Sequence, residues 1–352
     1  MKNKILTGLL LVLIGGWGSL SARNVGSNYA RQVNTLIGTK GVGLTSGYLY
    51  PGATYPYGMV QFTPSYFSKR SGFVINQLSG GGCEHMGNFP TFPVKGKLKM
   101  SPDNILNYRI NISEEKGHAG YYEAKVQEDI HAKLTVTERT GMASYEYPAD
   151  QQYGTVIIGG GISATPIDQA AIVITAPNKC EGYAEGGNFC GLRTPYKVYF
   201  VAEFDTDALE SGTWKRDELK PNTTFAEGEY SGVYFTFDVN KKKNIQYKIG
   251  VSYVSVENAR ENLKAENTGW DFLQIQNQAE SKWNHYLGKI EVEGTNPDRT
   301  TQFYTHLYRS FIHPNVCSDV NGEYMGADFR VHKSRSKHYT SFSNWDTYRT
   351  QI

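Results

Sequence analysis

The sequence of 352 residues lacks most of the features by which common classes of enzyme are recognised. Its four cysteines include no Cys-x-x-Cys pair, which argues against a structural zinc site. No run of Lys and Arg exceeds the triplet at 241–243 and the formal net charge is +2, so no nucleic-acid partner is indicated. No phosphate loop, metal-ligand helix or Ser-His-Asp elbow is recognisable. The composition, 39% hydrophobic and 20% charged, is that of a globular protein.

Long hydrophobic runs are absent as well. No segment approaches the roughly 20 apolar residues that a membrane-spanning helix needs. The apolar run Ile5–Ile14 is too short for such a helix, but it follows Lys2 and Lys4 and precedes small residues at 19, 21 and 22. This arrangement predicts a signal peptide over residues 1–22. We therefore expect an exported protein without a membrane span, periplasmic or extracellular, in a compartment that permits disulfides.

The four cysteines are Cys83, Cys180, Cys190 and Cys317. Cys180 and Cys190 flank a glycine-rich stretch and could form a disulfide. The alternative is that both are simply small buried residues. The spacing does not decide between these two readings.

Residues 24–256 carry a strand pattern. Apolar and aromatic residues alternate with others at Ile245, Tyr247, Ile249 and Val251, which is typical of one face of a half-buried strand. Several further stretches are rich in aromatic and β-branched residues and are separated by turn signals. Many strands and few helices predict a mainly β protein, with an antiparallel β-sandwich over this region.

The period changes after residue 256. The spacing of Phe272, Ile275, Ala279 and Trp283 predicts an amphipathic helix that ends at Gly288. A second helix is expected to open at 296, with a proline in its first turn. We therefore expect a helical linker over 257–298, followed from 299 to 352 by a fragment of a further helical unit.

Two motifs near the N-terminus are rich in glycine. Tyr50–Ser65 is a rigid entry to a strand, and a well-packed turn explains most of its residues. Leu78–Pro90 contains three consecutive glycines, which allow close approach of the backbone to another surface, and its polar groups suit a loop that touches a ligand. The alternative for this second motif is a tight turn with a buried cysteine. A lone His85 is more often structural than catalytic.

A third motif near the C-terminus gathers carboxylates. Asp319, Glu323, Asp328 and Asp346 lie within thirty residues, with Trp345 beside the last. Aromatic faces and carboxylates suit the recognition of sugars. Acidic residues in turns are more often solvated, however, so spacing alone gives only a weak indication of a sugar site. The Asn-Gly pair at 321–322 is also typical of a hairpin turn.

The motifs together resemble glycoside hydrolase family 92, whose members are exported α-mannosidases. The resemblance extends from about residue 33 to 349. It is carried, in order, by VNTLIGT, YPGATYPYGMVQFTP, SGGGC, YFVAEF, FYTHLYRSFIHPN, SDVNGEYMGAD and FSNWDTYR.

This resemblance implies an N-terminal β-sandwich, a helical linker and the start, at 299–352, of a catalytic (α/α)6 barrel that this chain would contain only in part. It also implies an inverting, calcium-dependent exo-α-mannosidase, with α-1,2 linkages as the expected type. The catalytic acid, the catalytic base and most calcium ligands would lie in the barrel, so no catalytic or metal-binding residue is assigned here. We expect this chain to be inactive alone and to need a barrel domain, which a separate gene could encode.

The resemblance assigns five residues to the mannose pocket. Gly82 and Cys83 match the loop that reaches into the site, Asp328 matches the carboxylate after the NGEYMG turn, and Trp345 and Asp346 match the barrel entry. The stretch from Tyr66 to Cys83 departs from the family pattern, which leaves the linkage specificity open. The competing hypothesis is a non-catalytic module for carbohydrate binding or protein interaction.

Overall fold

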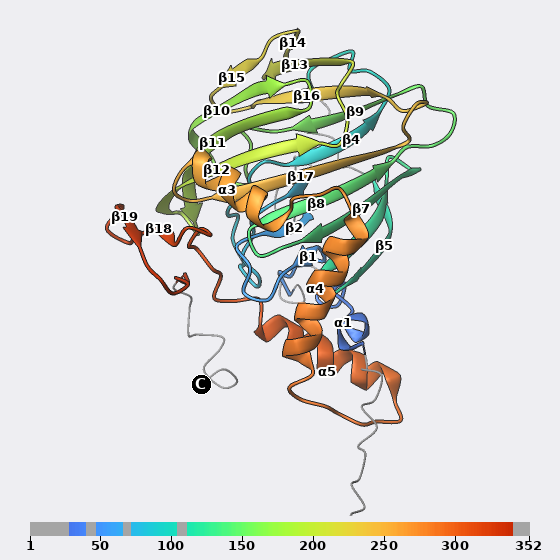
Figure 1. The fold of residues 1–352 in the computed structure, drawn as a ribbon, viewed down its shortest axis with the longest axis vertical. Coiled ribbons are helices and arrows are strands. Elements are labelled where there is room, and N and C mark those ends of the chain that lie inside the picture. Colours follow the sequence, from blue (N-terminus) through green and yellow to red (C-terminus); the bar gives the residue numbers. More distant parts are fainter. Residues whose placement is uncertain (1–27, 40–46, 66–71, 104–110, 341–352) are drawn as a thin grey trace, which may run out of the picture.

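The computed structural model describes residues 28–39, 47–65, 72–103 and 111–340, and in this part of the chain two antiparallel β-sheets pack face to face. The predicted β-sandwich is therefore confirmed. Figure 1 shows the two layers above a group of helices, of which α1 precedes the strands in the chain and α4 and α5 follow them. The predicted signal peptide at 1–22 lies outside the described residues. Within those residues, no helix has the length and apolar character needed to cross a membrane.

The first sheet combines four strands from residues 53–95 with four strands from residues 153–238. Its strands, in spatial order, are β1 (Ala53–Thr54), β2 (Gln61–Pro64), β3 (Phe73–Val74), β4 (Thr91–Lys95), β9 (Tyr153–Ile158), β16 (Ser231–Asp238), β13 (Glu210–Lys215) and β14 (Glu218–Pro221). The Tyr50–Ser65 motif forms β1, β2 and the connection between them, and the Leu78–Pro90 motif falls on the long loop between β3 and β4.

The second sheet contains the longest strands. Its order is β15 (Phe225–Glu227), β10 (Ile167–Ala176), β11 (Lys179–Phe189), β12 (Leu192–Phe204), β17 (Asn244–Ser252), β8 (Thr140–Glu146), β7 (Ile130–Val136), β6 (Tyr121–Val126) and β5 (Ile112–His118). The hairpin of β11 and β12 is long enough to project its turn beyond the neighbouring strands.

The core lies between the sheets. Ile245, Tyr247, Ile249 and Val251 on β17, the alternation seen in the sequence, are all at most 1% exposed. The outer face of β17 is buried too, because α3 (Val256–Glu266) covers it and packs Ala259 and Leu263 there. Because α3 covers the outer face, residues on both faces of β17 are buried over most of the strand, where the alternation predicted burial of one face only.

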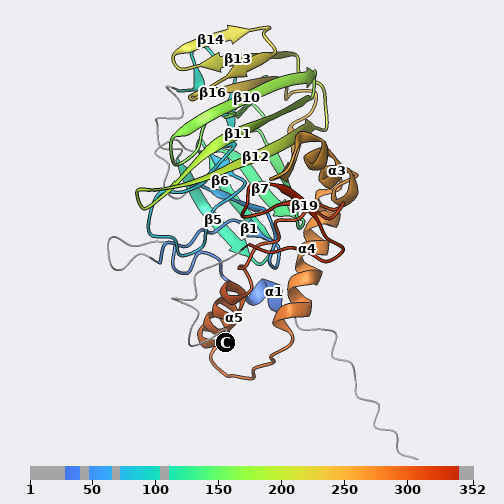
Figure 2. The same ribbon diagram turned by 90° about the vertical axis from the view of Figure 1, so that its left-hand side faces the viewer.

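Three helices form a second, smaller core below the sandwich (Figures 1 and 2). They are α1 (Tyr29–Gln32), α4 (Phe272–Leu287) and α5 (Pro297–Ser310). Both predicted helices are confirmed. The Asp271 side chain caps α4 by accepting a hydrogen bond from the Gln274 amide, and Asn296 caps α5.

The Tyr50–Ser65 segment joins this second core to the sandwich. Trp283 donates its indole N–H to the carbonyl of Thr54 at 2.7 Å, and the hydroxyl groups of Thr54 and Tyr308 lie 2.8 Å apart. Arg309 donates to the carbonyl of Tyr50 at 3.1 Å. Buried polar groups of the segment thus find partners on both helices. The packed-turn interpretation holds for these residues.

The chain after α5 returns toward the sandwich. It forms a small hairpin of β18 (Glu323–Met325) and β19 (Val331–Lys333), shown in red in Figure 1. The expected turn at Asn321-Gly322 is present: the Gly322 amide donates to the carbonyl of Asp319 and Gly322 has a φ of +85°. The strands of the two sheets end at Ser252 and α3 begins at Val256, while the division at 257–298 and 299–352 stays a prediction.

We predict that Trp283→Ala lowers the free energy of unfolding by about 3–5 kcal/mol, because it removes a fully buried ring that contacts Tyr308. Urea denaturation of the purified chain measures the change. Leu273→Ala on the same helix is the matched control, since Leu273 is 58% exposed and should change stability by less than about 0.5 kcal/mol. Equal effects of the two substitutions would contradict this account of α4.

Candidate functional site

The glycine loop, defined as residues 78–85, lies between β3 and β4 and is held by two imidazoles. The Nε2 atom of His85 accepts a hydrogen bond from the Leu78 amide at 2.9 Å. The Nε2 atom of His313 accepts one from the next amide, Ser79, at 3.0 Å. The consecutive amides of Leu78 and Ser79 therefore both donate to histidine nitrogens, one from the loop itself and one from a residue far along the chain.

The two histidines are uncharged in this arrangement. A ring nitrogen that accepts a hydrogen bond carries no proton, so His85 must carry its proton on Nδ1, which lies 2.6 Å from the carbonyl of Cys83. Burial lowers the pKa of His85, and burial likewise lowers the pKa of His313. The structural interpretation of His85 is confirmed: the residue is 3% exposed and shapes the loop.

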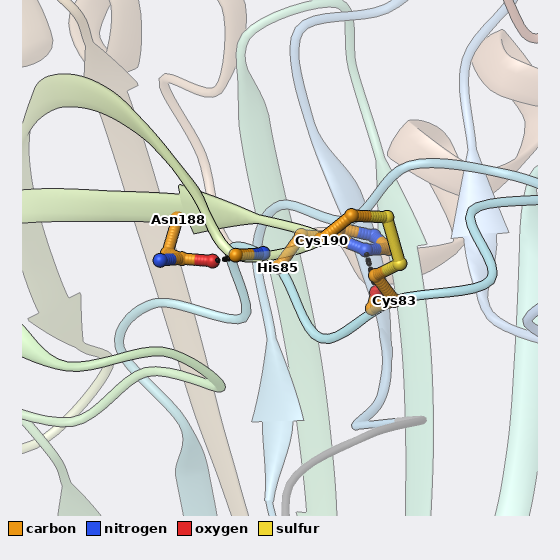
Figure 3. The surroundings of a disulfide bond; sticks show 5 residues. Cys83, His85, Asn188 and Cys190 are labelled. Atoms are coloured by element: carbon orange, nitrogen blue, oxygen red, sulfur yellow. Dashed lines mark hydrogen bonds between the residues drawn. A yellow bond between two sulfur atoms is a disulfide. The ribbon is translucent and has the colours of Figure 1, made fainter.

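A disulfide fixes the loop on its other side (Figure 3). It joins Cys83 to Cys190, which are separated by 107 positions in the sequence, and their two Cα atoms lie 5.3 Å apart. The possible pairing of Cys180 with Cys190 is therefore wrong. Cys180 faces the core of the sandwich on β11 and is a free, buried thiol, whereas Cys190 stands at the exposed turn between β11 and β12. The length of β11 separates the two cysteines, because ten residues of extended chain span roughly 30 Å.

Asn88, one of the polar residues of the Leu78–Pro90 motif, supports the glycine loop from behind it in the sequence. Its amide and side chain exchange hydrogen bonds with Asn76 at 2.8 and 3.0 Å, and its Oδ1 atom also accepts from the hydroxyl of Tyr196 at 2.5 Å. All three side chains are largely removed from solvent. The exposed members of the loop are instead Gly80, Gly82 and Glu84.

The glycine loop is connected to the C-terminal motif through His313. The Nδ1 atom of His313 lies 2.8 Å from Oδ1 of Asn315, and the backbone of Asn315 exchanges hydrogen bonds with Thr340. Thr340 is five residues before Trp345 in the sequence. The glycine loop is therefore linked through His313 to Asn315 and Thr340, which are far from it in the sequence.

Asp319 anchors the C-terminal motif to α3. Its carboxylate accepts hydrogen bonds from the Ser252 hydroxyl at 2.6 Å, the Asn258 amide at 2.8 Å and the Asn262 amide at 2.6 Å. Burial raises the pKa of the Asp319 carboxyl, and the three donors offset part of that rise. This acid is 2% exposed, so it is a structural residue and no sugar ligand.

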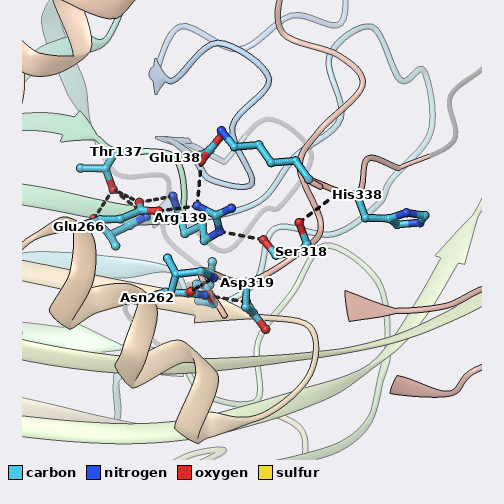
Figure 4. A network of polar contacts seen from close by, with 12 residues as sticks. Thr137, Glu138, Arg139, Asn262, Glu266, Ser318, Asp319 and His338 are labelled. Carbon is cyan, nitrogen blue, oxygen red and sulfur yellow. Dashed lines mark hydrogen bonds and ion pairs between the residues drawn. The ribbon is translucent and has the colours of Figure 1, made fainter. Parts of the chain in front are cut away.

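Arg139 holds the residue before Asp319 (Figure 4). Its Nε atom donates to the Ser318 carbonyl at 2.7 Å, and its Nη1 atom lies between Glu138 at 2.8 Å and Glu266 at 2.6 Å. Glu266 ends α3 and also accepts from the amide of Arg139. A buried ion-pair cluster therefore sets the path of the chain from Ser318 onward.

Asp328, predicted to contact sugar, lies exposed on the β18–β19 hairpin. Its carboxylate is 2.9 Å from Nε2 of His332 and accepts from the amide of Arg330 at 3.2 Å. All of these partners belong to its own hairpin, so the structure does not join Asp328 to Gly82 or Cys83. Trp345 and Asp346 lie outside the described residues. Of the five predicted positions, only Gly82 and Cys83 lie together in the glycine loop, and their contact with a sugar stays a prediction.

Sequence reasoning missed the contributions of Cys190, His313 and Arg139. His313 is 234 residues away from the amide it binds, and no spacing rule connects such positions. One signal in the sequence pointed to the role of Cys190, namely its position directly before Gly191. In a two-residue hairpin turn with positive φ at both residues, the first residue is normally Asn or Asp. A cysteine there indicates a bond that requires it.

A cavity of about 760 Å³ lies beside the exposed face of α4, away from these motifs. It is wide open, and no residue of the glycine loop or of the segment 313–340 lines it. Its walls are Tyr55, Asp271, Leu273, Gln274, Asn277, Gln278, Ser281, Lys282 and His285. The convergent buried polar groups are at the glycine loop, which is therefore the better candidate for the site.

Two models of known protein families match this chain, and together they cover most of it. The model of the glycosyl hydrolase family 92 N-terminal domain matches residues 32–252, and the model of the family 92 catalytic domain matches residues 258–352.

Similar solved structures include a family GH92 α-mannosidase from Bacteroides thetaiotaomicron, with 26% identity and a TM-score of 0.81 over 92% of this chain and 47% of that one. The same enzyme has been solved in complex with mannoimidazole. A secreted glycosidase of Arthroderma benhamiae, itself uncharacterised, is 26% identical over 89% of this chain and 45% of its own length. The chain thus spans about half the length of these relatives.

We predict that Asp319→Asn lowers the free energy of unfolding by about 2–4 kcal/mol. Whichever oxygen becomes an amide nitrogen, it faces the side-chain N–H group of Asn258 or Asn262. Urea denaturation measures the loss, and Asp328→Asn, at an exposed acid, is the control that should change little. A change below about 0.5 kcal/mol for Asp319→Asn would reject the anchor.

The two loop histidines predict a pH dependence. Because their pKa values in the folded state lie below the ordinary 6.5, the unfolded chain binds more protons between those values. Their contribution to stability is therefore complete above about pH 6.5 and is lost as the pH falls toward the lowered values.

The measurement is the difference in unfolding free energy between pH 7.5 and pH 5.5, taken for the wild type and for His85→Gln/His313→Gln. The double variant should show the smaller difference. His118, whose pKa is also lowered by burial, is present in both proteins and cancels. Identical pH slopes would show that the imidazoles do not hold the loop as neutral acceptors.

Proposed function

Because this chain belongs to glycosyl hydrolase family 92, we propose that it is the sugar-contacting N-terminal portion of an α-mannosidase that acts on mannose-containing glycans. The observation that carries the proposal is the glycine loop: its backbone is exposed at Gly80 and Gly82, and a disulfide and two neutral histidines hold it in place. A rigid loop with open backbone suits a ligand covered with hydroxyl groups. The mannoimidazole complex of a relative supports mannose as the sugar.

The finer parts of the proposal are exo-cleavage with inversion at α-1,2 linkages and dependence on calcium. Inverting hydrolysis needs a carboxylic acid and a carboxylate on opposite faces of the sugar. In the described part of the chain, Asp319 is buried as an anchor and Glu138 and Glu266 are paired with Arg139. We therefore assign this chain the binding and orienting of the sugar and place the acid and base elsewhere in the enzyme.

Among the described residues, no group of three His, Cys, Asp or Glu side chains is placed to hold a metal ion, so no carboxylate cluster for calcium is found there. The proposal accordingly places the calcium ligands outside them, and no step of binding described here passes through the ion.

Export is the proposed route of the protein. The N-terminal pattern of residues 1–22 and the secreted relative both support it. A disulfide at the site is consistent with an oxidising compartment, periplasmic or extracellular.

Titration of the purified chain with methyl α-mannoside, followed by amide chemical shifts, tests the binding role. We expect shifts at the glycine loop and no release of mannose from α-1,2-mannobiose under the same conditions. Gly82→Ala should weaken binding by about tenfold, because an added methyl group occupies the exposed backbone where the sugar would lie. A Cβ atom at Gly82 comes no closer than 3.8 Å to Tyr48, so the variant should fold.

Gly269→Ala is the matched control, since its Cβ atom meets nothing within 4 Å and the position is remote from the loop. Equal affinities of the two variants would reject the loop as the mannose site. Hydrolysis by this chain alone would contradict the proposal that the catalytic acid and base lie elsewhere in the enzyme. It would require a pair of catalytic carboxylates within the chain.

A further inference from the structure

The turn of the β11–β12 hairpin is built in an unusual way. Cys190 and Gly191 form a two-residue turn, and both have positive φ, +52° and +84°. A cysteine is strained in that conformation, which asparagine or glycine adopts more readily. The turn therefore tolerates an unfavourable residue in order to present a thiol to Cys83.

The hairpin also bends before it reaches its turn. The register of β11 and β12 shifts between Gly186 and Asn188, and Gly187 in that bulge has a φ of +126°. A bulge of this kind redirects the end of a hairpin and is frequent beside functional sites. Here the bend brings the turn to the glycine loop (Figure 3).

Two independent contacts fasten the turn to the loop. One is the Cys83–Cys190 disulfide. The other is the edge-on contact of the Phe189 ring with His85, with centroids 5.8 Å apart. Since His85 itself holds Leu78 and Cys83, the turn acts on the shape of the loop both directly and through that imidazole.

The surface of the turn remains open. Residues 190–195 are all exposed, and Leu192 is 72% exposed. Beside it, Arg193 forms an ion pair with Asp168 at 2.7 Å. A Cβ atom added at Gly80 or Gly191 meets nothing within 4 Å, so free space borders both the loop and the turn. An apolar side chain next to a guanidinium–carboxylate pair offers both a surface for a sugar ring and partners for its hydroxyl groups.

We infer that the β11–β12 turn, residues 188–195, is a positioning and specificity element for an oligosaccharide whose terminal mannose occupies the glycine loop. Cys190 and Phe189 hold the loop in shape, and Leu192 and Arg193 contact the sugar units that follow the terminal one. The inference rests on the proposed function. It makes the ligand a chain of at least two sugars rather than free mannose.

The positioning role is measured without any ligand. In Cys83→Ser/Cys190→Ser, hydrogen exchange of the Leu78 and Ser79 amides should be at least about tenfold faster than in the wild type. Cys317→Ser is the matched control, because it also changes a cysteine to serine and leaves the disulfide intact. Phe189→Ala should accelerate the same two amides while keeping the disulfide. Unchanged exchange in both loop variants would overturn the positioning role.

The specificity role is measured with two probes, methyl α-mannoside and an α-linked mannotriose. Leu192→Ala/Arg193→Ala changes only exposed side chains, and it should weaken mannotriose binding by about tenfold while methyl mannoside binding stays the same. Leu209→Ala, 54% exposed and away from the turn, should alter neither.

The outcomes separate this inference from the proposed function. Equal binding of mannotriose to the wild type and to the turn variant overturns the specificity role. In that case binding of methyl α-mannoside by the wild type still supports the proposed function. A wild-type chain that binds neither probe overturns the proposed function and the specificity role together, while the exchange data still decide the positioning role.

Discussion

The geometry of the site depends on two hydrogen bonds in which uncharged imidazoles accept consecutive backbone amides, those of Leu78 and Ser79. A loop with three glycines has little conformational preference of its own, so its shape must be imposed from outside. Burial keeps both histidines neutral, and only a neutral ring can accept from an amide. The packing around His85 and His313 therefore determines the backbone that a ligand meets.

The C-terminal segment at Ser318 and Asp319 is likewise held by residues that are distant in the sequence. The C-terminal segment has few apolar contacts of its own, and its course is set by Arg139 at Ser318 and by three donors at Asp319. Those donors come from β17 and α3, elements of the sandwich and its covering helix. The sandwich is thus a rigid base onto which polar segments from both ends of the chain are fastened.

Local patterns in the sequence were sufficient for the architecture. The alternation on β17, the helical spacing from Phe272 and the helix opening at Asn296 all follow from neighbouring residues, and the structure agrees with each. The site could be predicted only where one motif contains it, as at Gly82 and Cys83. The partners His313 and Cys190 are more than a hundred residues from the groups they bind, and only the folded topology brings them together. Asp319 is a case in which the sequence pattern misleads. Its carboxylate is of the kind found in sugar sites, but it is buried and accepts hydrogen bonds only within the protein.

The positions of the cysteines have a consequence for the order of events during maturation. In an extended, unpaired chain Cys180 and Cys190 enclose a short loop, so they meet more readily than Cys83 and Cys190 do across 107 residues. Once β11 has formed, the same two residues are held about 30 Å apart along the strand and Cys180 is enclosed in the core. Formation of the β11 strand before oxidation would leave Cys83 as the thiol within reach of Cys190, so the pattern of thiol pairing records which of the two processes came first.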